Sequence, residues 1–240
     1  MAGLMALVGS GEYLPVMVPV ESLLLRGRPA RYVQLATAAA PEGPQSLARW
    51  HGLGRQQAQR LGVEQVVVDV RDRTDADDAR LADMVAGAGL VYLSGGSPTY
   101  VAQTLRGTAV WAAIEQAWQD GASLAGCSAG AMALTGWVPS IRTVVAHPDP
   151  GLGLLPHLRV LPHFDRMLGW VPDLLTRALL RSPDGVTVLG IDEDTALVGG
   201  PHEWTVHGRQ SVWVLSEAGR QEHPAGERLV TGPLPATPGG

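Results

Sequence analysis

Short apolar runs alternate with segments of helical periodicity through the first half of the chain. A short, continuous apolar run is typical of a strand that is buried on both faces, as in a parallel sheet. Strands that alternate with helices predict such a sheet, covered by helices on both faces. The expected strands are Leu4–Val8, Arg31–Leu35, Gln65–Val70, Leu90–Leu93 and Ser123–Ala125, and the expected helices are Gln45–Leu61, Asp75–Ala86 and Thr108–Gln119.

The second half of the chain has a different pattern, because short apolar segments follow one another closely around one helical segment, Arg166–Arg181. Strands joined by short turns are expected to be antiparallel. The fold class is therefore α/β, a mostly parallel sheet flanked by helices on both faces, with antiparallel strands in the C-terminal part. The later strands are expected at Arg142–Val145, Leu158–Leu161, Val186–Ile191, Ala196–Val198, Trp204–Val206 and Val212–Leu215.

The chain is expected to form a single domain over residues 1–220. Its 240 residues, of which 45% are hydrophobic, suit one large core, and no repeat or linker divides them. The remaining stretch, Gln221–Gly240, is rich in proline and glycine and predicts a poorly ordered C-terminal tail.

Charge and composition exclude several classes of function. The net charge of −5 leaves no basic patch for nucleic acid, and no apolar run approaches the length of a membrane span. The N-terminus has no basic segment followed by a long apolar region, so we expect no secretory signal. All 18 basic residues are arginine, which excludes a Schiff-base lysine, a Ser–Lys dyad and a P-loop lysine. A single cysteine excludes an internal disulfide and a cysteine-rich metal site. We therefore expect a cytoplasmic enzyme with no metal and no cofactor, and a homodimer remains an option.

The segment Ala125–Ala131 carries the strongest chemical signal. It contains Gly126-x-Ser128-x-Gly130, the pattern of a nucleophile elbow, between an apolar run and a helix-forming run. In such a turn the serine is strained, the glycines leave room for neighbouring backbone, and the helix N-terminus offers unpaired N–H groups. The alternative interpretation is a turn rich in glycine and alanine between two buried elements.

A serine nucleophile needs a base, and the base needs an orienting acceptor. Among seven histidines, His163 is preferred because it follows the apolar run Leu158–Leu161. The acid is expected in Gly190–Leu197, where Glu193 can accept a hydrogen bond from the ring N–H of His163. A surface or packed histidine and a solvated hairpin turn are the alternatives, since spacing alone does not choose these residues.

An oxyanion hole requires two convergent N–H donors. The amide of Ala129, directly after the serine, is the first candidate. The amide of Gly96 is the second, because the paired glycines in Leu93–Pro98 let backbone approach a reacting carbonyl, although a plain strand-to-helix turn explains them equally well. Cys127 is a rival nucleophile, but it is out of register with the flanking glycines, so we expect a small buried residue that points away from the site.

Several of these segments also occur together in a known family. The segments Tyr92–Gly96, Gly126–Ala131, Pro162–Phe164 and Gly190–Leu197, with the opening Leu7–Glu12, resemble the dipeptidase E/cyanophycinase family of serine peptidases. The similarity runs over roughly residues 4–215. It implies a class I glutamine amidotransferase-like fold, a three-layer arrangement of the flavodoxin type. It also implies that Ser128 is the nucleophile, His163 the base and Glu193 the acid.

The sequence departs from the family pattern near the expected substrate. Pro162 precedes the histidine where cyanophycinases have glutamine, and Arg166 is the only nearby match to their pair of arginines. The family's Gly-Gly-Asn-Gln is replaced by Gly-Gly-Ser97-Pro98. Ser97 and Arg166 are nevertheless candidates for substrate binding. The reason for Arg166 is that a guanidinium can bind a carboxylate through two hydrogen bonds. A surface salt bridge is the alternative for Arg166.

The expected function is hydrolysis of small peptides by a serine hydrolase through an acyl-enzyme, with aspartyl or isoaspartyl bonds as candidate substrates. Two other functions stay open. A glutamine amidotransferase-like protein needs Cys127 as its nucleophile, and a non-catalytic binding module on the same fold leaves Ser128 unreactive.

Overall fold

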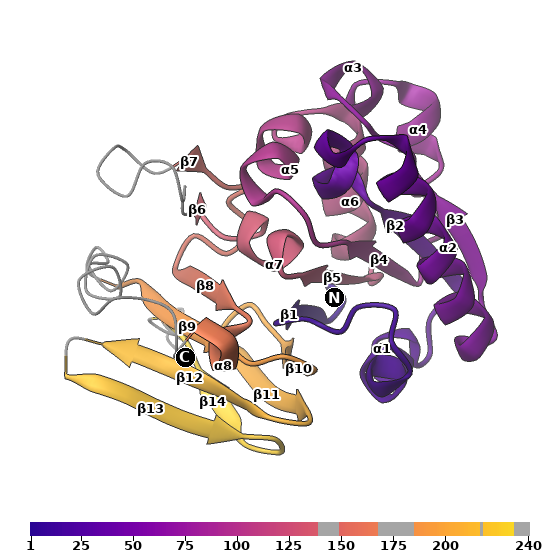
Figure 1. Cartoon of the computed structure of the whole chain (residues 1–240). Coiled ribbons are helices and arrows are strands. Elements are labelled where there is room, and N and C mark those ends of the chain that lie inside the picture. Colours follow the sequence, from indigo (N-terminus) through magenta and orange to yellow (C-terminus); the bar gives the residue numbers. More distant parts are fainter. Residues whose placement is uncertain (139–148, 168–184, 217, 233–240) are drawn as a thin grey trace, which may run out of the picture.

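The computed structural model of the chain describes residues 1–138, 149–167, 185–216 and 218–232. Its centre is an eight-stranded sheet in the order β14-β11-β10-β1-β5-β4-β2-β3 (Figure 1). The neighbours from β1 to β3 are parallel, whereas β10, β11 and β14 extend the sheet with antiparallel pairing. The strands are β1 Met5–Val8, β2 Arg31–Leu35, β3 Glu64–Val67, β4 Leu90–Leu93, β5 Ser123–Cys127, β10 Thr195–Gly199, β11 Glu203–Gly208 and β14 Arg228–Val230.

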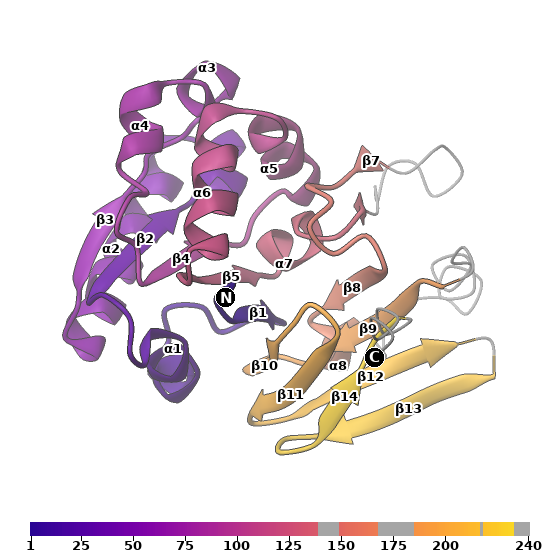
Figure 2. The same ribbon diagram turned by 180° about the vertical axis from the view of Figure 1, so that it is seen from behind.

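Helices cover both faces of this sheet, because side chains along each strand alternate between two buried clusters. On β1, Met5 and Leu7 belong to one cluster, and Ala6 and Val8 to the other. Helices α1 and α2 pack on the side of Ala6 and Val8, and α3 to α7 pack on the opposite side, which Figure 2 shows from behind. The helices are α1 Val18–Leu25, α2 Pro44–Leu61, α3 Arg73–Ala76, α4 Ala79–Asp83, α5 Pro98–Leu105, α6 Ala109–Gln119 and α7 Ala129–Ala133, with 3₁₀ turns η1 Pro15–Met17 and η2 Thr37–Glu42.

A second, four-stranded sheet lies next to β10, in the order β13-β12-β9-β8 (Figure 1). Within it, β8 and β9 are parallel and the other neighbours are antiparallel. The chain leaves β9 in this sheet and enters β10 in the large sheet through residues 192–194. The remaining elements are β6 Trp137–Val138, β7 Asp149–Pro150, β8 Leu158–Pro162, α8 Phe164–Met167, β9 Thr187–Ile191, β12 Ser211–Ser216 and β13 Gly219–Pro224.

The predicted fold class is confirmed, since the structure has a large, mainly parallel sheet between helical layers and antiparallel strands near the C-terminus. The strands β2 and β4 coincide with the predicted Arg31–Leu35 and Leu90–Leu93. The strand expected at Arg142–Val145 and residues 168–181 of the expected helix lie outside the described residues. No helix in the described ranges is long and apolar enough to cross a membrane.

Two predicted elements are wrong in detail. The expected helix Asp75–Ala86 consists of two short helices, because Asp78 caps the second one by accepting a hydrogen bond from the amide of Arg80. The strands β8 and β9 are parallel rather than antiparallel, because the long stretch of chain between them permits a crossover where a short turn does not.

The expected tail Gln221–Gly240 is also wrong over its first part. Most of β13 and all of β14 fall within it, and they pair with β12 and β11. Leu229 is only 7% exposed, and the Thr231 hydroxyl accepts a hydrogen bond from the Trp204 indole N–H at 2.9 Å. The buried Leu229 side chain and the hydrogen bond of Thr231 anchor a segment that is rich in proline and glycine. Residues 233–240 lie outside the described residues.

Candidate active site

Ser128 lies in a sharp turn between a strand and a helix, the context that the Gly-x-Ser-x-Gly pattern predicts. Ser128 directly follows β5, and α7 begins at the next residue. Its backbone has φ 49° and ψ −108°, a strained conformation for a residue with a side chain. The turn persists because the Ser128 amide donates to the Val8 carbonyl at 2.9 Å, and its own carbonyl accepts from the Met132 amide at 3.0 Å. The serine is thereby held at the carboxyl edge of the large sheet.

The two glycines of the elbow are required by close backbone packing. A Cβ atom on Gly126 would lie 2.6 Å from the carbonyl group of Gly130, and one on Gly130 would lie 2.4 Å from the Leu93 carbonyl oxygen. Real Cβ atoms essentially never approach backbone so closely. The start of α7 therefore crosses β4 and β5 at a distance that only glycine allows, and this crossing fixes the direction in which Ser128 points.

Replacing Gly130 by alanine should lower the stability of the protein, whereas the same replacement at an ordinary glycine in a helix raises it. Gly→Ala in a helix normally stabilises by about 0.5–1 kcal/mol, and we expect this for Gly52→Ala in α2, where nothing lies within 4 Å of the new atom. Gly130→Ala should instead destabilise by about 1–3 kcal/mol, because the Leu93 backbone must move. Urea denaturation of both variants measures the difference, and a stabilised Gly130→Ala variant would contradict this account of the elbow.

His163 and Glu193 come together because β8 and β9 are parallel neighbours. Pro162 pairs with Ile191 in the register of the two strands, so the residues that follow them leave the sheet side by side. His163 Nδ1 lies 2.9 Å from Glu193 Oε1, and His163 Nε2 lies 3.1 Å from Ser128 Oγ. His163 has φ 52°, and this uncommon backbone conformation turns the ring toward the elbow.

A polar network positions Glu193. Its backbone amide donates to Asp165 Oδ1 at 2.9 Å, and Gln210 Nε2 donates to both the Glu193 carbonyl and Asp165 Oδ2. Arg166 Nε lies 2.8 Å from Glu193 Oε2, the oxygen that His163 does not use. Arg166 is thus brought to the site as a partner of Glu193, and its predicted contact with substrate stays a prediction.

The carboxylate next to Glu193 has a different environment. Asp192 is 4% exposed and accepts hydrogen bonds from the Trp213 indole N–H and the Ser211 amide. Burial raises the pKa of Asp192, and these hydrogen bonds oppose the rise. The acidic turn is therefore not the solvated hairpin considered above: it connects two sheets, and Asp192 fixes it to β12.

The two candidate oxyanion donors lie beside the serine. A Cβ atom on Gly95 would lie 3.6 Å from Ser128 Cβ, so the loop after β4 runs along the elbow. Gly96 has φ 136°, and a Cβ there would lie 2.4 Å from the Ala38 carbonyl oxygen, so this position also requires glycine. Neither the Gly96 amide nor the Ala129 amide donates a hydrogen bond to any described residue.

Two further predicted residues are placed as follows. Ser97 is the N-cap of α5, where its hydroxyl accepts a hydrogen bond from the Tyr100 amide at 3.3 Å, so a role in substrate binding stays a prediction. Cys127 is fully buried in the cluster beneath α1 and α2, on the face of β5 away from α7. Burial raises the pKa of its thiol well above the usual range, which disfavours the reactive thiolate.

The comparison with known families decides to which group this arrangement belongs. The model of peptidase family S51 matches residues 52–205, well over half of the chain. The chain belongs to peptidase family S51. The resemblance to the dipeptidase E family of serine peptidases is thereby confirmed, and the protein is a peptidase.

Two solved structures are similar to this S51 peptidase over nearly its whole length. A peptidase from an acI-B1 actinobacterium is 41% identical with a TM-score of 0.89, and the match covers 96% of this chain and 97% of that one. A protein from Listeria monocytogenes EGD-e, provisionally named peptidase E, is 16% identical with a TM-score of 0.58, over 93% of this chain and 99% of that one. The second likeness concerns the fold alone. No curated protein matches the sequence.

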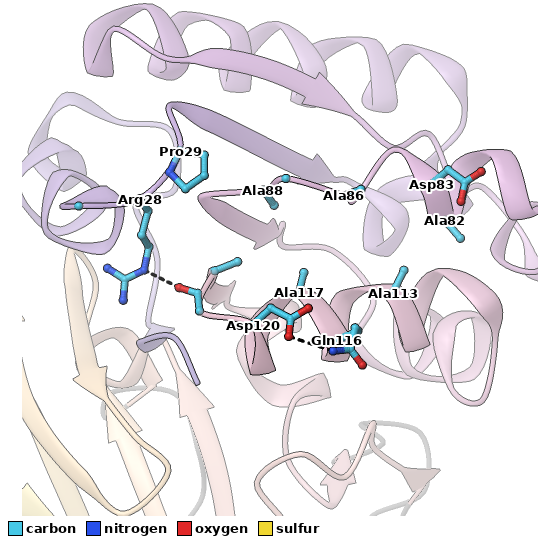
Figure 3. A pocket seen from close by; sticks show the side chains of 14 residues that line it. Arg28, Pro29, Ala82, Asp83, Ala86, Ala88, Ala113, Gln116, Ala117 and Asp120 are labelled. Carbon is cyan, nitrogen blue, oxygen red and sulfur yellow. Dashed lines mark hydrogen bonds between the residues drawn. The ribbon is translucent and has the colours of Figure 1, made fainter. Parts of the chain in front are cut away.

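A pocket of about 660 Å³ in this S51 peptidase lies at the edge of the large sheet opposite to Ser128 (Figure 3). It is lined by residues that precede β2, β4 and β5, whereas Ser128 follows the carboxyl end of β5. Most of the lining is alanine and glycine. Arg28 Nε donates to the Gly121 carbonyl, and Gln116 Nε2 donates to Asp120, so these polar groups already have partners. The pocket is separate from the Ser128 site.

Proposed function

We propose that this peptidase is a serine hydrolase in which Ser128 is the nucleophile, His163 the general base and Glu193 the orienting acid. The observation that carries the proposal is the continuous chain from Ser128 Oγ through both ring nitrogens of His163 to Glu193, with contacts of 3.1 and 2.9 Å. A serine needs such a base to become nucleophilic, and the carboxylate selects the tautomer that leaves Nε2 free to accept the proton.

The proposed reaction has two stages. His163 Nε2 takes the hydroxyl proton as Ser128 Oγ forms a bond to the substrate carbonyl carbon, and the carbonyl oxygen becomes an oxyanion. The Ala129 and Gly96 amides donate hydrogen bonds to this oxyanion. The tetrahedral intermediate collapses, the C–N bond breaks, and the proton on His163 passes to the leaving amine. Water, deprotonated by His163, then attacks the acyl carbon. The bond from this carbon to Ser128 Oγ breaks, His163 returns the proton to the serine oxygen, and the acid product leaves.

The substrate class that we propose is small peptides, with aspartyl and isoaspartyl bonds as the first candidates. The family supports peptide hydrolysis, and Arg166 is a cation at the site that can attract a substrate carboxylate. Ser97, at the start of α5 beside Gly96, is a second candidate contact. A panel of Asp-X, β-Asp-X and β-Asp-Arg dipeptides would rank these bonds by kcat/KM.

The alternatives use the same fold differently. A glutamine amidotransferase-like reaction needs an accessible thiolate, whereas Cys127 is fully buried and its pKa is raised. A non-catalytic binding module has no need for a histidine within 3.1 Å of a serine on a strained turn. Both observations favour serine hydrolysis.

Covalent labelling separates the three functions. A fluorophosphonate probe should attach to wild-type protein at Ser128, as mapped by peptide mass spectrometry, because only an activated serine reacts with it. Cys127→Ala should still be labelled, and Ser128→Ala should not. Wild-type protein that stays unlabelled would exclude the serine reaction. Loss of hydrolysis on alkylation of Cys127 would then favour the thiol reaction, and no effect of alkylation would favour the binding module.

A further inference from the structure

Glu12 lies beside the proposed oxyanion hole but has no part in the reaction described above. It belongs to the loop that follows β1, at the same edge of the sheet as Ser128. This loop packs closely on the turn that carries Glu193: a Cβ atom on Gly9 would lie 2.1 Å from the Asp192 carbonyl oxygen, and one on Gly11 would lie 2.5 Å from Asp194 Oδ1. The loop that carries Glu12 is therefore held against this turn by close packing.

The Glu12 carboxylate joins two elements of the proposed site. Its Oε1 accepts a hydrogen bond from the Gly95 amide at 3.1 Å, and its Oε2 accepts one from the Cys127 thiol at 2.9 Å. Gly95 immediately precedes Gly96, the candidate oxyanion donor, and Cys127 immediately precedes Ser128. A Cβ on Gly95 would lie 2.6 Å from Glu12 Oε1, so glycine at this position makes room for the carboxylate.

The buried thiol is suited to hold the carboxylate in place. Cys127 is fully buried, so its S–H group has no competition from water. Burial and the adjacent Glu12 carboxylate both raise the pKa of the thiol, which keeps the proton that the hydrogen bond needs. This contact with Glu12 explains why a cysteine that cannot itself attack a substrate lies next to the proposed nucleophile.

We propose that Glu12 is a positioning residue, whose carboxylate fixes the Gly95–Gly96 loop against the elbow so that the Gly96 amide points to the oxyanion. This role rests on the proposed serine mechanism. The hydrogen bond from the Gly95 amide to Glu12 Oε1 sets the plane of that amide. A negative charge near a forming oxyanion opposes it, so the contribution of Glu12 comes from geometry and not from its charge.

The test uses the rate of fluorophosphonate labelling, which requires no knowledge of the natural substrate. Phosphonylation also develops a negative oxygen in the oxyanion hole, so a displaced donor slows it. Glu12→Ala should reduce the maximal labelling rate about 10- to 100-fold, with little change in the probe concentration that gives half of that rate. Glu12→Gln should recover most of the rate, because its amide oxygen still accepts from Gly95.

Cys127→Ala provides a matched variant, since it removes only the group that holds the carboxylate. We expect a smaller loss, and no additional loss when Cys127→Ala is combined with Glu12→Ala, because both changes act through the same contact. If Glu12→Ala does not fold, Glu12→Asp replaces it: its carboxylate is one methylene too short to reach both partners, and its labelling should also be slow.

Four results would overturn the proposal. Glu12→Ala or Glu12→Asp labelled at the wild-type rate would show that the loop needs no such support. Glu12→Gln as slow as Glu12→Ala would mean that the charge matters rather than the acceptor. A change confined to the half-saturating probe concentration would place Glu12 in ligand binding. An unlabelled wild-type protein would overturn the serine mechanism, and this role with it.

Discussion

Replacing Ser128 by alanine is expected to lower kcat/KM for the best dipeptide of the panel by about 10⁴- to 10⁶-fold, while the protein remains folded. The hydroxyl oxygen is the only atom removed, and the bond that it would form to the substrate carbonyl has no substitute in the described site. Alanine has a Cβ like serine, so the conformation at φ 49° is no more strained in the variant. Hydrolysis measured by amine release, with circular dichroism as the check on folding, tests this result.

Cys127→Ala is the control for this experiment, because it changes the neighbouring residue on the same strand. Its activity should stay within about tenfold of wild type, since the thiol acts only through a positioning contact. A Ser128→Ala variant that hydrolyses the dipeptide at a substantial fraction of the wild-type rate would contradict the proposed nucleophile.

Replacing Glu21 by glutamine is expected to stabilise the protein in alkaline solution and to change little in acid. Glu21 lies in α1, is 1% exposed, and its carboxyl group is buried next to the side chains of Gln57 and Tyr32. Burial raises its pKa to about 8, against the weaker lowering effects of Gln57 and Tyr32. The ionised form is therefore costly in the folded state, and glutamine avoids this cost.

The sign of the pH dependence follows from the number of protons bound. Between about pH 4.5, where a glutamate ionises in the unfolded chain, and pH 8, the folded protein holds a proton that the unfolded chain has lost. The contribution of Glu21 to the free energy of unfolding thus falls with rising pH by about 1.4 kcal/mol per unit in this window. Urea denaturation should give similar stabilities for wild type and Glu21→Gln at pH 5, and a variant that is more stable by roughly 3–5 kcal/mol at pH 9.

Glu203→Gln is the matched control, because Glu203 is exposed and the same substitution there should not alter the pH dependence. If the stability of Glu21→Gln ran parallel to that of wild type from pH 5 to pH 9, Glu21 would not be the buried acid that loses its proton.

Much of the fold and of the candidate site could be predicted from local sequence. The apolar runs located the central strands, because strands buried on both faces leave a continuous hydrophobic signal. The glycines on either side of Ser128 predicted a strained turn, and the structure has one. His163 and Glu193 follow two separate strands, and the structure brings both to Ser128 through the parallel pairing of β8 and β9. That pairing was not predicted, so their proximity came from the family resemblance rather than from spacing.

Other parts could not be predicted because their signal depends on the tertiary fold. Asp165 and Gln210 hold Glu193, yet nothing in their own segments distinguishes them from surface polar residues. Glu12 is the exception: it follows the carboxyl end of a parallel strand, where ligands of such sheets gather, and this rule could have identified it. The strands within residues 221–230 were not predicted because they lie at the edges of their sheets. Edge strands have few buried side chains and therefore a weak hydrophobic pattern.

The chain passes from the small sheet to the large sheet between β9 and β10, so the residues of the candidate site come from both sheets. Ser128 and the two candidate amide donors follow strands of the large sheet, whereas His163 follows β8 of the small sheet and Glu193 lies in the connection between the two sheets. Each sheet can be fully folded while the candidate site is incomplete, because the hydrogen bond of 3.1 Å between Ser128 and His163 exists only while the two sheets keep their alignment. The proposed catalysis therefore depends on how the two sheets are docked, and we expect a small relative shift of the sheets to abolish it while every strand stays folded.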